Sequence, residues 1–467
     1  MFTKEEVYMC ISGKISCFFK SKALPFLFLS AVLCVTSCTY VRGVPRTDFD
    51  AYYESGNFKQ AADFNVAKWQ GKEKMPYLNA LDTGSAFMAA GSYDSADKYF
   101  GSAQNDIRND DTDGYDAKYY EKVMLNTMNG LNLWQNHDLV NARVEFNRAY
   151  SAQQSAVREN KKAIAEADSE VKKQNAQRSF SSLSEQASSL YDGFGDLSAY
   201  KNFANPYASY LAGLYLVLNG RSQSDIENGI NYLKRVRSMM PNNSFVKKDL
   251  QMAEKIAKGD DVPRRVWVVY EEGMAPTLAK RTFSVPIYFG AGWKWASLAL
   301  PEIIPSDSAY ENLTAKVQSN GKTKTFKAEE ITSIDDIMAA EYKDRMPAEV
   351  AKAVVWMVAN LAAQEGLQRI GKKDSAANFF GVVASVIVSQ ITNPVEIRTW
   401  KTLPKTIKTA SFDMPKGAEL SLSAGGFDIA DKIVFKQNTK YAIVYVRMPT
   451  KGAKPAVIVS EFNGKEF

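Results

Sequence analysis

Small and aromatic residues recur at a helical spacing in residues 84–103 of this 467-residue chain. Small residues let two antiparallel helices approach closely, and aromatic side chains fill the space between the helices. The spacing therefore predicts two helices joined by a tight turn. Counted from the first residue, the offsets are 0, 3, 7, 9, 12, 16 and 19, occupied by Gly84, Phe87, Gly91, Tyr93, Ala96, Phe100 and Ala103.

Three further segments repeat this spacing, namely 49–64, 130–149 and 207–241. The segment 130–149 has His137 where the first one has Gly91, at the expected turn between helices. In the segment 207–241 we expect about four additional residues before Gly229.

The four segments resemble tetratricopeptide (TPR) repeats. The resemblance implies an α-helical TPR-like solenoid over residues 49–260, with a groove that binds protein partners. Inner-face positions such as Asn79 and Asn126 are candidate groove residues.

A long polar stretch, residues 140–190, interrupts the repeats. It contains a run rich in Ala, Glu, Lys and Gln, in which the sparse apolar residues Val157, Ile164 and Val171 recur every seven positions. This pattern predicts a long helical arm. One interpretation is a solvated extension; the other is an arm for binding a partner or for self-association.

The pattern changes after residue 260 from helical spacing to β-branched and aromatic runs. Two helices, at 347–364 and 375–392, interrupt the expected strands. We therefore predict an α+β domain over residues 263–467, built mostly from local hairpins, one of them turning at residues 437–438. The expected strands are 265–270, 283–289, 313–317, 324–326, 406–412, 432–435 and 441–447.

Two apolar stretches of this domain allow alternatives. The segment 375–392 is apolar on nearly all sides, so we expect a buried central helix, or else a membrane or interface segment. The run 283–305 contains Trp293 and Trp295 among Gly and Pro residues. It is either a loop that covers the core or an exposed groove for an apolar ligand.

The first 37 residues have the features of a lipoprotein signal peptide. Lysines precede a ten-residue apolar run, 26–35, which is too short to span a bilayer and is followed by small residues and Cys38. This resembles the lipobox of bacterial lipoproteins and implies lipidation of Cys38, with residues 38–48 as a tether. Thr39 follows the cysteine, which favours the outer membrane, on its periplasmic side, over the inner membrane.

The composition excludes several chemistries. The one His of the chain, His137, is expected in the turn of a repeat, and no Cys follows Cys38. We therefore expect no Ser–His–Asp triad, no Cys–His dyad and no His-based metal site within one chain. Phosphate-binding and dinucleotide-binding glycine motifs are missing, so we expect no cofactor. A net charge of +6 does not indicate a nucleic-acid partner.

Carboxylates remain as candidate catalytic or ligand-binding groups. Glu271 and Glu272 open the sequence EEGMAP after a predicted strand, and Arg398 and Trp400 belong to RTWKTLP. With the lipobox and the repeats, these motifs resemble a family of uncharacterised bacterial TPR lipoproteins. The resemblance implies a role in the cell envelope, alongside cell-wall or outer-membrane assembly. We expect a non-enzymatic scaffold; the alternative is a carboxylate-based hydrolase, or a binding protein for a cell-wall or lipid ligand, in the C-terminal domain.

Overall fold

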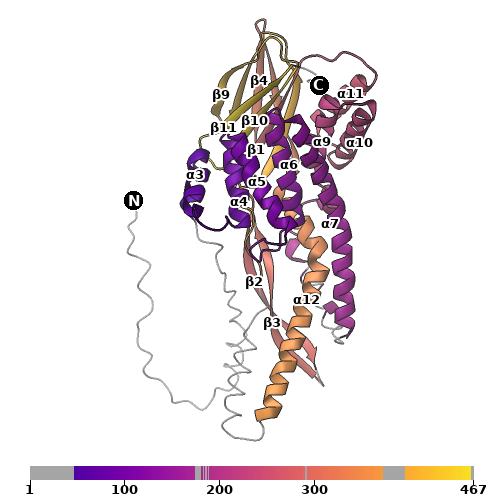
Figure 1. The fold of residues 1–467 in the computed structure, drawn as a ribbon. Coiled ribbons are helices and arrows are strands. Elements are labelled where there is room, and N and C mark those ends of the chain that lie inside the picture. Colours follow the sequence, from indigo (N-terminus) through magenta and orange to yellow (C-terminus); the bar gives the residue numbers. More distant parts are fainter. Residues whose placement is uncertain are drawn as a thin grey trace, which may run out of the picture. The chain divides into compact units, whose positions relative to one another are not determined.

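An N-terminal region of paired helices leads into a C-terminal region rich in strands (Figure 1). The computed structural model describes residues 47–173, 180, 181, 184, 187, 189–289, 292–371 and 395–463, without the side chains of 283–298 and 360–371. The helices before the first strand are α2 (Asp48–Glu54), α3 (Phe58–Trp69), α4 (Tyr77–Ala89), α5 (Tyr93–Arg108), α6 (Tyr119–Gln135), α7 (Leu139–Lys173), α9 (Pro206–Asn219), α10 (Gln223–Met239) and α11 (Ser244–Ala257), with short 3₁₀ helices η2 (Ser189–Tyr191) and η3 (Leu197–Phe203).

Helix pairs lie at all four segments that carry the small-and-aromatic spacing. Offsets 0 and 16 face each other: a Cβ atom on Gly84 would lie 2.6 Å from the ring of Phe100, and one on Gly130 would lie 2.8 Å from the ring of Phe146. Glycine at offset 0 therefore lets the two helices approach in these two pairs. His137 lies in the turn between α6 and α7 with a φ of 63°.

The pair α9–α10 has a close approach with glycine on both helices. A Cβ atom on Gly229 would lie 2.8 Å from the Gly213 carbonyl oxygen. A Cβ atom on Gly213 would lie 3.1 Å from the side chain of Leu233, which stands four residues beyond offset 16, in agreement with the expected additional residues. Polar caps start the last helices, because Asn205, Ser222 and Asn243 accept backbone N–H groups at the first turns of α9, α10 and α11.

Two stacked sheets and a separate antiparallel pair, β2–β3, form the strand-rich region. A five-stranded sheet has the order β11–β10–β1–β7–β6, in which β1 and β10 are parallel, and a four-stranded antiparallel sheet has the order β5–β4–β8–β9. The strands are β1 (Arg265–Glu272), β2 (Thr277–Phe289), β3 (Gly292–Ile304), β4 (Leu313–Ser319), β5 (Lys322–Lys327), β6 (Glu329–Ser333), β7 (Thr406–Asp413), β8 (Glu419–Ala424), β9 (Phe427–Val434), β10 (Tyr441–Met448) and β11 (Ala456–Phe462).

Strand β1 is buried on both faces, because each face packs on a different layer. Val266, Val268 and Tyr270 belong to a core between the two sheets. Trp267 and Val269 belong to a larger core that also contains residues of the helices from α2 onward. The described residues belong to one compact unit, with the helices on one face of the five-stranded sheet and the four-stranded sheet on the other.

Several predicted elements are corrected. Strands β9 and β10 lie in different sheets, so residues 437–438 connect two layers and do not turn a hairpin. The helix expected from residue 347 is the second part of α12 (Ile334–Gly371), with Pro347 inside it. The run 283–305 is part of the paired strands β2 and β3 and not a loop. The expected helix 375–392 lies outside the described residues.

The predicted arm begins as a continuous helix, α7, of 35 residues. Helix α12 packs along it (Figure 1), and the Asn160 amide donates to the Asp344 carbonyl oxygen at 3.0 Å. Part of the arm is therefore covered by the protein's own chain. Across the residues that the structure describes, no helix is both long and apolar enough to span a membrane.

Candidate functional site

The two motifs singled out in the sequence lie side by side at the end of β1. The Ala275 N–H donates to the Leu403 carbonyl oxygen at 2.6 Å, and the Lys405 N–H donates to the Glu272 carbonyl oxygen at 2.9 Å. These bonds join segment 271–276 to segment 398–405 like two short strands. We call the contact between these segments and the helices that cover them the buried seam.

Glu271 and Glu272 point to opposite faces of the sheet, as neighbours on a strand must. The Glu271 carboxylate accepts hydrogen bonds from the hydroxyls of Tyr445 at 2.7 Å and Tyr207 at 3.4 Å, on the helix side. The Glu272 carboxylate accepts from the Ala309 N–H at 2.9 Å and the Thr406 hydroxyl at 2.8 Å. Burial raises the pKa of Glu271. The two carboxylates therefore cannot flank one substrate as an acid pair.

Arg447 ties the two segments together. Its guanidinium is fully buried and donates to the carbonyl oxygens of Gly273 at 2.6 Å and Thr402 at 3.2 Å. Burial alone would lower the pKa of Arg447, but the nearby Tyr53, Tyr445 and Glu271 outweigh it and raise that pKa. The sheet register places Arg447 beside Glu271. A buried cation thus holds both backbone segments in place.

Trp400 joins the seam to the helices. Its backbone N–H donates to the Glu121 carboxylate of α6 at 3.1 Å, and its indole N–H donates to the Ser85 hydroxyl of α4 at 3.2 Å. The Thr402 hydroxyl donates to Asp82 of α4 at 2.8 Å. Burial raises the pKa of Asp82 to about 7, although Lys401 and Thr402 oppose that rise.

The remaining predicted residues are placed as follows. Arg398 forms an ion pair with Glu396 at 2.6 Å and lies over the Tyr115 ring at 5.5 Å, half-buried at the edge of the seam. Trp293 and Trp295 belong to β3, but their side chains lie outside the described part of the chain. Cys38 also lies outside the described residues. The side chains of Glu271 and Trp400 therefore lie in the buried seam, which holds the helices on the sheet, whereas the Glu272 carboxylate is buried on the opposite face.

A solvent-accessible groove lies elsewhere, on the outer side of the helix pairs. Its volume is about 390 Å³. Helices α7 and α10 supply its walls at helical spacing, and Leu216 of α9 contributes to it. The other lining residues are Arg143, Asn147 and Tyr150 on α7, and Asp225, Asn228, Asn231, Tyr232 and Arg235 on α10; we call this the outer groove.

Charges in the outer groove are only partly paired. Arg143 forms an ion pair with Asp225 at 2.5 Å, and this hydrogen bond is the main cause that lowers the pKa of Asp225. Within the described residues, Arg235 has no ion-pair partner, and the side-chain amides of Asn147, Asn228 and Asn231 form no hydrogen bond. The groove therefore presents one unpaired cation and three free amides to solvent.

Sequence reasoning missed the outer groove, although a signal for it exists. On α10, Asn228, Asn231, Tyr232 and Arg235 lie at i, i+3, i+4 and i+7, which places them on one helix face. The matching signal on α7 is the i, i+4, i+7 series of Arg143, Asn147 and Tyr150. Polar stripes of this kind are typical of any solvated helix, so only the packing of both α7 and α10 against α9 shows that the stripes line one groove.

The inner-face positions proposed from the sequence lie elsewhere. Asn126 is half-buried and accepts a hydrogen bond from Gln104 at 3.0 Å, and Asn79 is also half-buried. Over the described ranges, no group of His, Cys, Asp and Glu side chains is arranged to hold a metal ion. No protein-family model matches the chain, and neither the curated proteins nor the solved structures give a significant match.

Proposed function

We propose that the protein is a non-enzymatic, lipid-anchored scaffold of the bacterial cell envelope. The anchor in this proposal is Cys38, and the location is the periplasmic face of the outer membrane. Four helix pairs, two of which have the Gly84–Phe100 type of contact, support a TPR-like solenoid. The proposal differs from the sequence-based hypothesis in where the partner binds.

The inner face of the helix pairs is occupied by the protein's own sheet. Trp134 of α6 packs on Tyr441 and Phe462 at ring distances of 6.4 and 6.2 Å, and Tyr210 of α9 reaches Thr409 of β7. The outer face of the helix pairs is therefore the face that a partner can bind.

The observation that carries the proposal is the set of free amides and the unpaired Arg235 in the outer groove. An Asn side chain has both a donor and an acceptor, so it can donate to a carbonyl oxygen and accept from an N–H of the partner's backbone. Arg235 adds a preference for a carboxylate, which it can bind through two N–H groups. The fitting partner is an extended protein segment with an acidic residue.

Site-specific photo-crosslinking in intact envelopes tests this proposal. A benzoylphenylalanine replaces Tyr150 in the outer groove, and the control carries it at Tyr52, which is equally exposed at 38%. We expect a defined protein adduct from position 150 that is lost when Arg235→Ala and Asn231→Ala are added. These two changes remove no hydrogen bond or ion pair within the described residues, so the free energy of unfolding should stay within about 0.5 kcal/mol.

Two results would contradict the proposal. One is the same set of adducts from positions 150 and 52, which would mean non-specific capture. The other is an adduct from position 150 that persists without Arg235 and Asn231. The anchor is tested separately, because Cys38→Ala should move the protein out of the membrane fraction while leaving the groove unchanged.

A further inference from the structure

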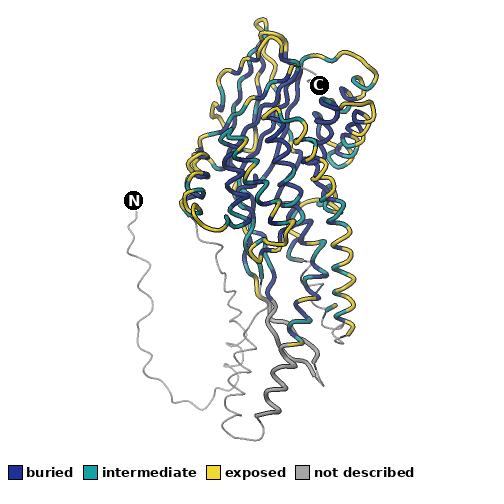
Figure 2. The backbone as a smooth tube through the Cα atoms, viewed as in Figure 1, coloured by how far each residue is buried: buried dark blue, intermediate teal, exposed yellow. Residues whose placement is uncertain are grey.

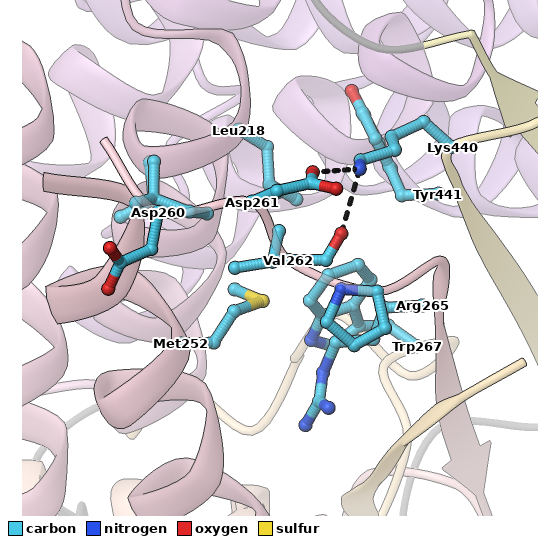
Figure 3. A pocket seen from close by; sticks show the side chains of 12 residues that line it. Leu218, Met252, Asp260, Asp261, Val262, Arg265, Trp267, Lys440 and Tyr441 are labelled. Carbon is cyan, nitrogen blue, oxygen red and sulfur yellow. Dashed lines mark hydrogen bonds and ion pairs between the residues drawn. The ribbon is translucent and has the colours of Figure 1, made fainter. Parts of the chain in front are cut away.

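A second cavity lies between the ends of α9 and α11 and the first residues of β1 and β10 (Figure 3). Its volume is about 190 Å³. It is separate from the outer groove, because no residue lines both. Most of its wall is apolar, formed by Val217, Leu218, Met252, Ile256, Val262, Pro263, Trp267 and Tyr441.

The Trp267 indole is the unusual group in this wall. Its side chain is 2% exposed, and its N–H has no hydrogen-bond partner in the described structure. Buried polar groups in native proteins are nearly always hydrogen-bonded, so an unpaired buried donor beside a cavity calls for an acceptor from outside the chain. The other polar wall group, the Tyr441 hydroxyl, already donates to Asn219 at 2.8 Å.

The polar rim indicates the charge of the ligand. Lys440 is bound to Asp261 at 2.7 Å and to the Val262 carbonyl oxygen at 2.7 Å (Figure 3). Arg265 is held by Asp249 at 3.0 Å and Asp413 at 2.8 Å. Both cations are therefore neutralised, and the carboxylate of Asp260 also lies at the rim. An anionic ligand has no free cation to bind here.

We propose that this cavity is a binding site for a small, neutral, largely apolar molecule that carries one hydrogen-bond acceptor for the Trp267 indole N–H. An apolar cavity of about 150 Å³ is large enough for benzene. The volume of 190 Å³ therefore fits an aromatic or branched aliphatic molecule of roughly ten non-hydrogen atoms. We call it the indole cavity.

Two probes of similar shape test the site on the full chain. Acetophenone has a carbonyl acceptor, and ethylbenzene lacks one. Titrations are followed by the ¹H–¹⁵N signals of the tryptophan indoles, with the Trp267 signal identified by its loss in Trp267→Phe. We expect acetophenone to bind roughly three- to tenfold more tightly than ethylbenzene and to shift the Trp267 signal downfield.

The variants separate a specific site from general stickiness. Trp267→Phe keeps the ring but removes the N–H, so both probes should bind it with equal affinity. Leu218→Trp fills the cavity and should abolish binding of both probes, with circular dichroism to verify the fold. Equal affinity of the two probes for the unchanged protein would overturn the proposal. Failure of both to bind it, or binding that survives Leu218→Trp in a folded protein, would do the same.

Discussion

Helices α4, α6 and α9 lie against the five-stranded sheet, whereas α5, α7 and α10 pack outside them and face solvent (Figure 2). The inner helices are buried along nearly their whole length and contribute polar groups such as Asp82 and Glu121, both of which accept hydrogen bonds. The outer helices are amphipathic and leave the amides of Asn228 and Asn231 without a partner.

This difference separates polar residues that hold the fold together from polar residues available for binding. An ionised group buried without its partner is costly, so every charge in the buried seam is satisfied within the chain. An exposed amide is already solvated by water, so leaving it unpaired costs little and keeps it available. The seam residues carry the sequence motifs, yet the outer groove is the better candidate for binding.

The largest effect is expected from removing the buried cation of the seam. Arg447→Met leaves the Gly273 carbonyl oxygen without its side-chain donor, removes one of the two donors to the Thr402 carbonyl oxygen and leaves Glu271 without its neighbouring charge. Removing a buried cation together with its hydrogen bonds, beside a buried carboxylate, is expected to cost about 3–5 kcal/mol. The matched control is Arg235→Met in the outer groove, with an expected change within about 0.5 kcal/mol.

Urea denaturation of the two variants measures this contrast. A loss for Arg447→Met no larger than that for Arg235→Met would show that the seam does not hold the helices on the sheet. Polar groups of the inner face would then contribute no more to stability than polar groups of the outer face.

Asp82 makes the stability of the inner face depend on pH. Its pKa is raised by burial from 3.8 to about 7, so the folded state holds this proton to a higher pH than the unfolded state does. The contribution of protonated Asp82 to the free energy of unfolding is therefore complete below about pH 4 and is lost as the pH rises through about 7. Between pH 5 and pH 8 the loss is on the order of 2–3 kcal/mol.

The variant Asp82→Asn isolates this effect, because an amide does not titrate and still accepts from Thr402. We expect the free energy of unfolding of the variant, relative to the unchanged protein, to increase between pH 5 and pH 8. Thermal unfolding of both proteins over this range measures the difference. A constant difference across the range would mean that Asp82 is not the titrating group.

The helix pairs could be predicted from local spacing, whereas the pairing of the strands could not. Gly84 and Phe100 contact each other within one helix pair, so their spacing is visible over twenty residues. Strand β1, by contrast, pairs with β7 and β10, which follow more than 130 residues later. Nothing in the run Arg265–Glu272 names those partners. The sequence located seven of the strands and missed β3, β6, β8 and β11. The order of the strands, and the hairpin expected at residues 437–438, could not be derived correctly for this reason.

The candidate residues show the same limit. Glu271 and Trp400 were found because their motifs are distinctive. Their roles, however, depend on burial and on hydrogen-bond partners from distant parts of the chain, such as Tyr207 and Ser85. The outer groove requires α7 and α10 to be neighbours. In the chain they are separated by 49 residues, 174–222, which include α9, so a stripe of amides on one helix could not indicate a site.

The smallest effect compares the same substitution on the inner and outer helix of one pair. Gly84 lies in α4, where an added Cβ atom would be 2.6 Å from Phe100, a ring that packs edge-on against Trp400 at 6.2 Å. Gly101 lies in α5 with no atom within 4 Å of an added Cβ. We expect Gly84→Ala to destabilise the protein by about 1–2 kcal/mol through overpacking. Gly101→Ala should stabilise it by roughly 0.5–1 kcal/mol through helix propensity.

Thermal unfolding of the two variants measures this contrast. Since the chemical change is identical, changes of opposite sign in the free energy of unfolding would show that packing between the inner and outer helices causes the difference. A stabilising Gly84→Ala would instead show that the inner helix can move away from Phe100, and that its position on the sheet is not fixed by this contact.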